Sequence, residues 1–299
     1  MNRTRLHPAR LRGALAPLAA ALILLAPSSH AQPASAQSLP ARPAGPPPQP
    51  TWTLTVGMVP LVAPAWQGSR DYALSIFPDI RVAYKDVAFA SVQDGFGVNL
   101  INRDGWKIGP IVRTRFGRRE SNGGSPFLVS GGSTALRGFG NIGLAGEFGG
   151  FVQYSPAGAL GRRLALRAEV RQGTGGHEGV VAEPSIRFSD RAGAFRYSLA
   201  LRSTFASSKY TQVYFGVTDE QAARAGLAAY QTGSGLVSAG LGGTLTRPLG
   251  KRGQHGALTL LAGYDRLGNV VADSTLIRER GRRDQFTLGL AYGYRFTWK

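Results

Sequence analysis

The chain has 299 residues, with 41 glycines, no cysteine and a formal charge of +18 at pH 7. The lack of cysteine excludes disulfide frameworks, thiolate metal sites and cysteine nucleophiles. Apolar residues make up 43% of the chain and its basic residues are scattered, which excludes a disordered polycation and predicts a folded domain.

Residues 1–31 have the pattern of a secretory signal peptide. Four arginines precede an apolar run at Ala14–Ala26, and Ser29-His30-Ala31 is a small-x-small cleavage pattern. The apolar run is shorter than the roughly 20 residues that a membrane-spanning helix needs, which disfavours a membrane anchor. We predict export and cleavage after Ala31, with Ala36 as the second choice. Loss of four of the 35 Lys and Arg, and of none of the 17 Asp and Glu, leaves a mature charge of +14.

Residues 32–50 differ in composition from the rest of the chain. They contain seven prolines in 19 residues, and Leu39 is their only aliphatic residue larger than alanine. Such a segment cannot bury enough apolar surface to offset the entropy of ordering it. We therefore predict a Pro-rich linker at 32–50, followed by one domain at 51–299.

The domain has a hydrophobic period of two, which is clearest at its C-terminus. Apolar and polar or small residues alternate there over thirteen positions, whereas an ordinary globular strand has about five or six residues. A tilted strand that crosses a bilayer needs about 9–11 residues, so this length favours a membrane protein. The apolar set is Phe286, Leu288, Leu290, Tyr292, Tyr294, Phe296 and Trp298.

The same alternation recurs along the domain. A soluble sandwich or lipocalin would alternate too, but the signal peptide, the strand lengths and the many small residues opposite the apolar face favour an all-β transmembrane antiparallel barrel. Because bacterial barrels have even strand numbers, we predict about twelve strands, with ten as the alternative and Tyr210–Val217 as a possible extra strand. The predicted strands are residues 51–62, 74–84, 85–92, 94–102, 105–118, 139–155, 160–172, 179–189, 193–206, 234–247, 255–265 and 284–298.

Long connections separate some of these strands. In the connection at residues 207–233, Thr218 and Gln221 have capping-box spacing and Gly226 follows an alanine-rich stretch, which predicts a short surface helix. Gly138–Gly143 fits the pattern G-x-G-x-x-G. Because this stretch opens a predicted strand rather than a helix, we interpret its glycines as easing strand curvature and not as a phosphate loop.

Charged residues fall on the face predicted to line the lumen. Two interpretations stay open: hydrogen-bonded Arg–Glu pairs that close a narrow barrel, or a basic lumen that favours anionic solutes. The candidate lumen residues are Arg113, Arg115, Glu147, Arg167, Glu169, Arg171, Glu183, Arg187, Arg196, Arg202 and Arg295.

A second basic cluster precedes the last strand. Guanidinium groups form strong bidentate contacts with phosphates, so these residues are either a site that contacts lipopolysaccharide or a solvated charged turn. The cluster contains Arg278, Arg280, Arg282 and Arg283.

The histidines of the mature chain predict neither catalysis nor metal binding. His177 and His255 both lie in glycine-rich turns, without a neighbouring nucleophile or a second ligand at metal-binding spacing. We predict no catalytic residue, no metal site and no cofactor.

Three stretches of the domain have the spacing of known family motifs: an opening of the type Y-x-G-S-x-x-Y … P, a G-P … G-R-R-E stretch and a tyrosine-rich stretch. They lie at Trp66–Tyr72 with Pro78 and Tyr84, at Gly109-Pro110 with Phe116–Glu120, and at Ser208–Val217 with Gln221-Ala222, Gly226-Leu227 and Tyr230. Together they resemble the MipA/OmpV family of Gram-negative outer-membrane proteins, from about Val56 to Phe296. The chain departs from the family pattern near Asn141, where an acidic residue is expected, and at its end, which runs three residues past Phe296.

The resemblance implies an outer-membrane barrel with no established catalytic residue. One member is linked, as a scaffold, to a murein hydrolase and synthase, and others are porin-like. We therefore predict an outer-membrane protein with a scaffolding role in murein (peptidoglycan) assembly, with a porin-like channel for small anionic solutes as the alternative and an outer-membrane hydrolase as a weaker third.

The predicted location also indicates which partners to expect. They are outer-membrane lipid, lipopolysaccharide, murein hydrolase or synthase proteins and the barrel-assembly machinery. Nucleic acid is not expected at the cell surface. The expected assembly signal is the aromatic set Tyr292, Tyr294, Phe296 and Trp298.

Overall fold

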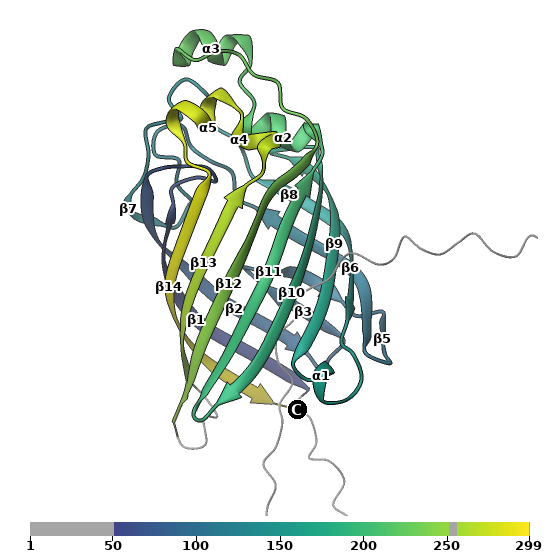
Figure 1. Ribbon diagram of the computed structural model, residues 1–299. Coiled ribbons are helices and arrows are strands. Elements are labelled where there is room, and N and C mark those ends of the chain that lie inside the picture. Colours follow the sequence, from purple (N-terminus) through teal and green to yellow (C-terminus); the bar gives the residue numbers. More distant parts are fainter. Residues whose placement is uncertain (1–50, 251–255, 299) are drawn as a thin grey trace, which may run out of the picture.

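Residues 51–250 and 256–298, which the computed structural model describes, form a closed antiparallel β-barrel (Figure 1). The predicted signal peptide, its cleavage at Ala31, the linker at 32–50 and His255 lie outside the described residues.

Twelve strands make up the wall, which confirms the predicted number. β4 and β5 both pair with β6 and together form one wall strand, while β7 (Leu128–Gly131) belongs to a loop and pairs with the end of β2. β1 closes the barrel by pairing with both β14 and β2. The wall segments are β1 (Trp52–Pro64), β2 (Tyr72–Tyr84), β3 (Ala88–Ser91), β4 (Gly95–Val98), β5 (Ile101–Arg103), β6 (Trp106–Arg115), β8 (Ala145–Tyr154), β9 (Leu164–Gly175), β10 (Val180–Ala192), β11 (Phe195–Ala206), β12 (Gly235–Leu249), β13 (Gly256–Leu267) and β14 (Asp284–Trp298).

The period of two places one face of each strand outside. Along β14 the predicted apolar set is exposed, while Gln285 on the other face is buried. Outward aromatic pairs occur at both ends of the wall: the rings of Trp52 and Tyr84 lie 4.8 Å apart at one end, and those of Tyr264 and Phe286 lie 5.1 Å apart at the other. An apolar band edged by aromatic residues is the surface that a bilayer requires of a barrel.

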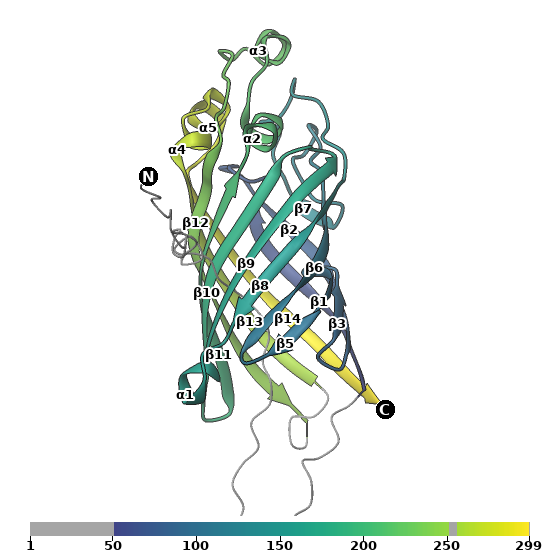
Figure 2. The ribbon, with the colours of Figure 1, turned by 90° about the vertical axis from the view of Figure 1, so that its right-hand side faces the viewer.

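The two ends of the barrel differ in the length of their connections. Both ends of the described chain and the short turns lie at one end, and the longer loops lie at the other (Figures 1 and 2). Outer-membrane barrels have short periplasmic turns and long extracellular loops. We therefore call the end with the short turns periplasmic and the end with the long loops extracellular.

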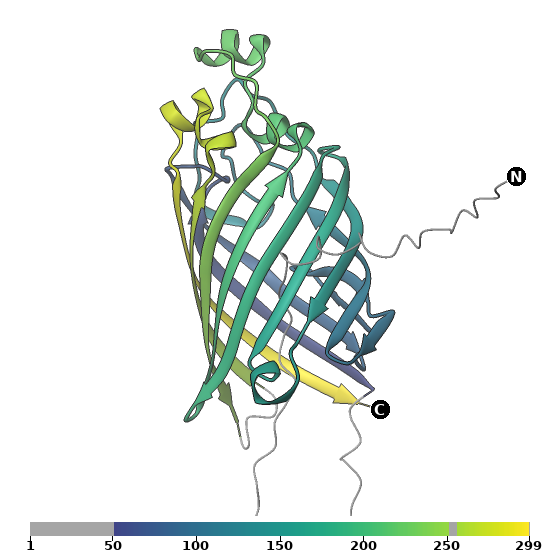
Figure 3. The same ribbon diagram turned by 45° about the vertical axis from the view of Figure 1, so that its right-hand side comes forward.

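Among the described residues, five short helices occupy the connections. α1 (Gly158–Gly161) lies in a periplasmic turn, while α2 (Ser208–Phe215), α3 (Asp219–Ala225), α4 (Asn269–Ala272) and α5 (Thr275–Arg280) lie at the extracellular end (Figures 1 and 3). No helix in the described ranges is long and apolar enough to span a membrane. The predicted capping box is present on α3, and Gly226 ends this helix in the left-handed conformation at φ 67°.

The structure differs from the predicted strands at two places. Tyr210–Val217 falls largely within α2, where the buried residues Tyr210, Thr211, Tyr214 and Phe215 follow a helical rather than an alternating period. The strand predicted at 139–155 begins only at Ala145. The extracellular stretch before it contains Gly138 and Gly140 at φ 90° and 76°, in the left-handed region of backbone conformation that favours glycine.

These glycines do not ease strand curvature, so that interpretation was wrong. The amides of Gly138 and Gly140 donate to the Glu120 carboxylate at 3.2 and 2.9 Å. Their backbone amides therefore converge on an anion, and that anion is a side chain of the same loop.

The hydrophobic core lies at the extracellular mouth rather than along the barrel. Loop residues such as Leu136, Phe215 and Leu276 are fully buried and pack in one cluster with Val181 and Val237 from the wall. We call this cluster the extracellular plug. Its members are Ala65, Trp66, Ala73, Leu136, Phe139, Val181, Ala206, Tyr210, Tyr214, Phe215, Val217, Leu227, Val237, Leu267, Val271, Ala272, Leu276 and Ile277.

Candidate functional site

Below the plug, arginine and glutamate side chains of β6, β8, β9 and β10 contact one another in the extracellular half of the barrel interior. At the centre, Arg171 is 1% exposed and donates to Glu147 at 2.8 Å, contacts Glu183 at 2.7 Å and donates to Glu169. We call this group the lumenal ion network. Its members, all among the residues predicted to line the lumen, are Arg113, Arg115, Glu147, Arg167, Glu169, Arg171 and Glu183.

Strand register explains why these residues meet. β10, β9, β8 and β6 are consecutive neighbours, and Glu147 lies opposite Arg113. Glu169 lies opposite Glu183, so two carboxylates face the same point of the lumen. Like charges at paired positions repel, and the guanidinium of Arg171, which contacts both carboxylates, offsets that repulsion. Ions this deeply buried are tolerated because each has a partner.

His177 connects the ion network to the plug. Its Nε2 lies 3.0 Å from Glu147 Oε1, and its Nδ1 accepts a hydrogen bond from the amide of Gly179 at 3.2 Å. Because Nδ1 accepts a hydrogen bond, the proton of the neutral ring lies on Nε2. The ring also packs edge-on against Tyr210, with ring centroids 5.0 Å apart. The sequence placed His177 in a turn, which is where it lies, but gave no sign that the side chain is buried.

A second contact, between Arg118 and Tyr214, connects the plug to another extracellular loop. Arg118 is buried, donates to the carbonyl of Tyr214 at 2.6 Å and lies 5.8 Å from the centre of the Trp66 ring. Burial lowers the pKa of Arg118 to about 10, so the guanidinium remains charged at neutral pH. Burial also raises the pKa of Tyr214 to about 12, which keeps the phenol neutral. Both residues lie in stretches that resemble family motifs, but the sequence did not indicate their contact, because it joins residues 96 positions apart.

The periplasmic half of the lumen is basic. Arg81, which was not among the predicted lumen residues, contacts Asp94 there at 3.2 Å. Arg202 pairs with Asp265 nearer the extracellular ends of β11 and β13. Arg81 and Arg295 both lie opposite Thr55 in the sheet, so they share the inward face with one strand between them. Arg187 and Arg196 also belong to inward positions of their strands.

The predicted lipopolysaccharide cluster divides into different environments. Arg280 donates to the carbonyls of Ala135 at 2.8 Å and of Ala225, and Arg283 donates to Leu267 at 3.3 Å. These two side chains therefore join loops. Arg278 and Arg282 are exposed.

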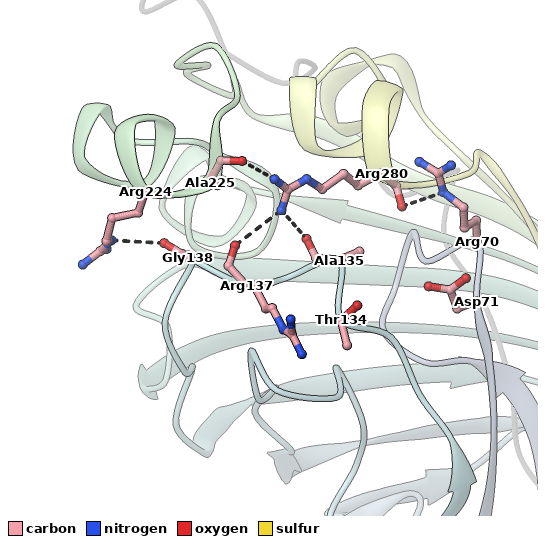
Figure 4. Close-up of a pocket in the computed structure, with 9 residues that line it drawn as sticks. All are labelled: Arg70, Asp71, Thr134, Ala135, Arg137, Gly138, Arg224, Ala225 and Arg280. Carbon is pink, nitrogen blue, oxygen red and sulfur yellow. Dashed lines mark hydrogen bonds between the residues drawn. The ribbon is translucent and has the colours of Figure 1, made fainter.

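A cavity of about 470 Å³ opens among the extracellular loops (Figure 4). Four arginines from four separate loops line it, together with a single carboxylate, Asp71. We call it the arginine pocket. Its lining is Arg70, Asp71, Thr134, Ala135, Arg137, Gly138, Arg224, Ala225 and Arg280.

Comparison with known proteins gives one family and several remote barrels. Residues 56–296 match the family model described as MltA-interacting protein MipA. No curated protein matches the chain.

Solved structures with a similar trace are outer-membrane proteins. An outer membrane channel from Pseudomonas putida F1 is 12% identical with a TM-score of 0.40, and the match covers 87% of this chain and 100% of that one. The NanC porin is 9% identical with a TM-score of 0.36, covering 81% and 98%. The outer membrane protein OprD from Pseudomonas aeruginosa is 10% identical with a TM-score of 0.29, covering 77% and 63%.

Proposed function

Because this chain belongs to the MipA family of outer-membrane barrels, we propose that it has a structural role linked to murein assembly. In this proposal the barrel is a rigid, closed body. Its periplasmic turns hold a murein-processing enzyme at the inner surface of the outer membrane.

The observation that carries the proposal is how the interior is filled. The ion network occupies the extracellular half of the lumen, and the plug packs on top of it. Glu147 joins the two, because it accepts from Arg115, Arg171 and His177. Because the interior side chains contact one another, the turns and loops are the surfaces that remain available to a partner.

The periplasmic turns have a chemistry suited to a protein partner. Exposed basic residues follow α1 in the turn between β8 and β9, at Arg162 and Arg163, and Arg191 is exposed beside the turn between β10 and β11. Arg163 lies 3.3 Å from Asp190, so these two turns are neighbours. A basic rim favours a partner with an acidic surface, since complementary charge speeds association and orients the partner. The description MltA-interacting, which the family carries, fits a murein enzyme as that partner.

Site-specific photocrosslinking in intact envelopes tests this proposal. A photoreactive amino acid at Leu160 in α1 is expected to capture a murein hydrolase or synthase, identified by mass spectrometry. The matched control is the same amino acid at Ala228, which lies in an extracellular loop. Capture of the murein enzyme from the periplasmic position alone supports the role. Capture of no murein enzyme, or equal capture from both positions, contradicts it.

A channel for small anions is the second candidate, and it is favoured by the arginines in the periplasmic half of the lumen. Rings of basic side chains select anions in pores. If this candidate holds, replacing the inward Arg295 by glutamine lowers the ratio of anion to cation permeability in planar bilayers. A matched Arg247→Gln change is expected to leave that ratio unaltered, because Arg247 lies on the outward face against Phe195.

A further inference from the structure

The arginine pocket differs from the lumenal ion network in how its charges are balanced. In the network each guanidinium contacts at least one glutamate. In the pocket four arginines face one carboxylate, Asp71, which itself accepts a hydrogen bond from Ser133 at 2.5 Å. The lining therefore has a formal excess of three positive charges.

Hydrogen bonds to backbone carbonyls position the arginines of the pocket without neutralising their charges. Arg280 donates to three carbonyl groups on two loops, and Arg70 Nε donates to the carbonyl of Arg280 at 3.1 Å (Figure 4). Arg224 donates through Nε alone, to the carbonyl of Gly138 at 3.2 Å. These contacts hold loops that are far apart in sequence around one cavity while their charges stay in place.

Two of the arginines have N–H groups that remain available for hydrogen bonds to a ligand. Within the described part of the chain, the Arg137 guanidinium has no hydrogen-bond acceptor, and both terminal nitrogens of Arg224 are likewise without one. Both side chains are exposed. Each presents the two parallel N–H groups that match the oxygens of a phosphate or carboxylate.

From this arrangement we infer that the arginine pocket binds a phosphorylated ligand at the cell surface. The arginines lie along the cavity rather than around one point (Figure 4), so the pocket suits a ligand with more than one anionic group. This site goes beyond the proposed periplasmic role and uses the opposite end of the barrel. Of the basic cluster predicted from the sequence, only Arg280 contributes to it.

Two sources can supply phosphate groups at this face: the glycolipid of the outer leaflet and free anions. Inorganic pyrophosphate serves as the free probe. Phosphatidylcholine vesicles that contain lipid A, with or without its phosphates, serve as the membrane probe. Binding of pyrophosphate alone indicates a free anion as the ligand, and binding of phosphorylated lipid A vesicles indicates the glycolipid.

The test compares the folded wild type with the double variant Arg137→Ala/Arg224→Ala in zwitterionic detergent. We expect affinity for the probe that wild type binds to fall at least tenfold, because two bidentate partners are lost. Of the contacts that tie the loops together, the change removes only that of Arg224 with Gly138 and spares those of Arg280 and Arg70. Heat-dependent gel mobility checks that the barrel of the variant is folded.

The matched control is Arg278→Ala/Arg282→Ala. It removes two exposed arginines from the loop that contributes Arg280, but none from the pocket lining. We expect its affinity to stay within about twofold of wild type. Equal losses in both double variants would mean binding by net charge alone, and either that result or wild type binding neither phosphorylated probe overturns the inference.

Discussion

Arg171 is the residue on which the packing of the barrel interior depends most. It contacts Glu147, Glu169 and Glu183 from one buried position. Arg171→Met keeps most of the volume and leaves three carboxylates without their common partner. Removing one partner of a buried ion group costs about 3–5 kcal/mol, so we expect a clearly lower urea midpoint for unfolding in detergent. Arg278→Met, at an exposed site, is the control, and an unchanged midpoint for Arg171→Met would contradict the assigned role.

Tyr214 predicts how stability depends on alkaline pH. Burial raises its pKa from an ordinary value of about 10 to about 12, so the folded protein holds the phenol proton more tightly than the unfolded chain does. The stability from this group is complete below about pH 10 and is lost as the pH rises through about 12. Tyr210, whose pKa burial also raises, acts in the same direction. Unfolding midpoints measured from pH 9 to 12 are therefore expected to fall.

Tyr214→Phe separates this effect from general alkaline damage. The Tyr214 hydroxyl is buried without a hydrogen-bond partner among the described residues, so its removal is expected to stabilise the plug by about 1 kcal/mol at neutral pH. The variant is also expected to show a shallower decline above pH 10. A decline as steep as in wild type would mean that Tyr214 is not the titrating group.

Alternation predicted the residues on the inward face, with Arg–Glu pairing as one interpretation, but it did not predict which of these residues pair. A period of two assigns each side chain to one face of the wall, and that is enough to place Arg171 and Glu147 inside the barrel. It says nothing about His177, which joins them from a turn, because a turn has no period. The contact between Arg118 and Tyr214 was not predicted for a related reason: it exists only once the long loops fold over the mouth.

Among the elements, α3 depends most clearly on local sequence. Its capping box joins Thr218 and Gln221, with Thr218 Oγ1 accepting from the Gln221 amide at 3.2 Å. Thr218→Ala is expected to destabilise this helix by about 1 kcal/mol, and Thr218→Ser by less. Because no residue of α3 is fully buried, the effect stays local. Limited proteolysis is expected to cut the alanine variant faster within residues 218–226, while its global unfolding midpoint stays unchanged; a shifted global midpoint would contradict this.

Strands proved more predictable than loops. β14 was predicted with its observed bounds, because a strand in a barrel wall faces lipid on one side throughout its length. β7 and α2 were not predicted, since both pack against other loops and their residues follow those contacts rather than a repeating environment. The glycines near Glu120 belong to the same class: their positive φ angles serve a local carboxylate and give no periodic signal.

The whole molecule combines an apolar exterior, an ionic interior and a hydrophobic plug at one end. Alternation, even strand number and strand length predicted the barrel and its twelve strands, because these properties follow from the bilayer. The filling of the interior could not be predicted from the sequence, since an inward Arg and Glu set is compatible with both a packed lumen and a basic pore. Contacts in three dimensions decide between these two, and they support the packed lumen in the extracellular half.

Single-channel recording in planar bilayers tests this account most directly. With refolded protein whose heat-dependent gel mobility confirms a closed barrel, the filled interior predicts no stable conductance steps at moderate voltage. Stable, anion-selective steps from the same preparation would contradict the account and would make the channel the function of this barrel.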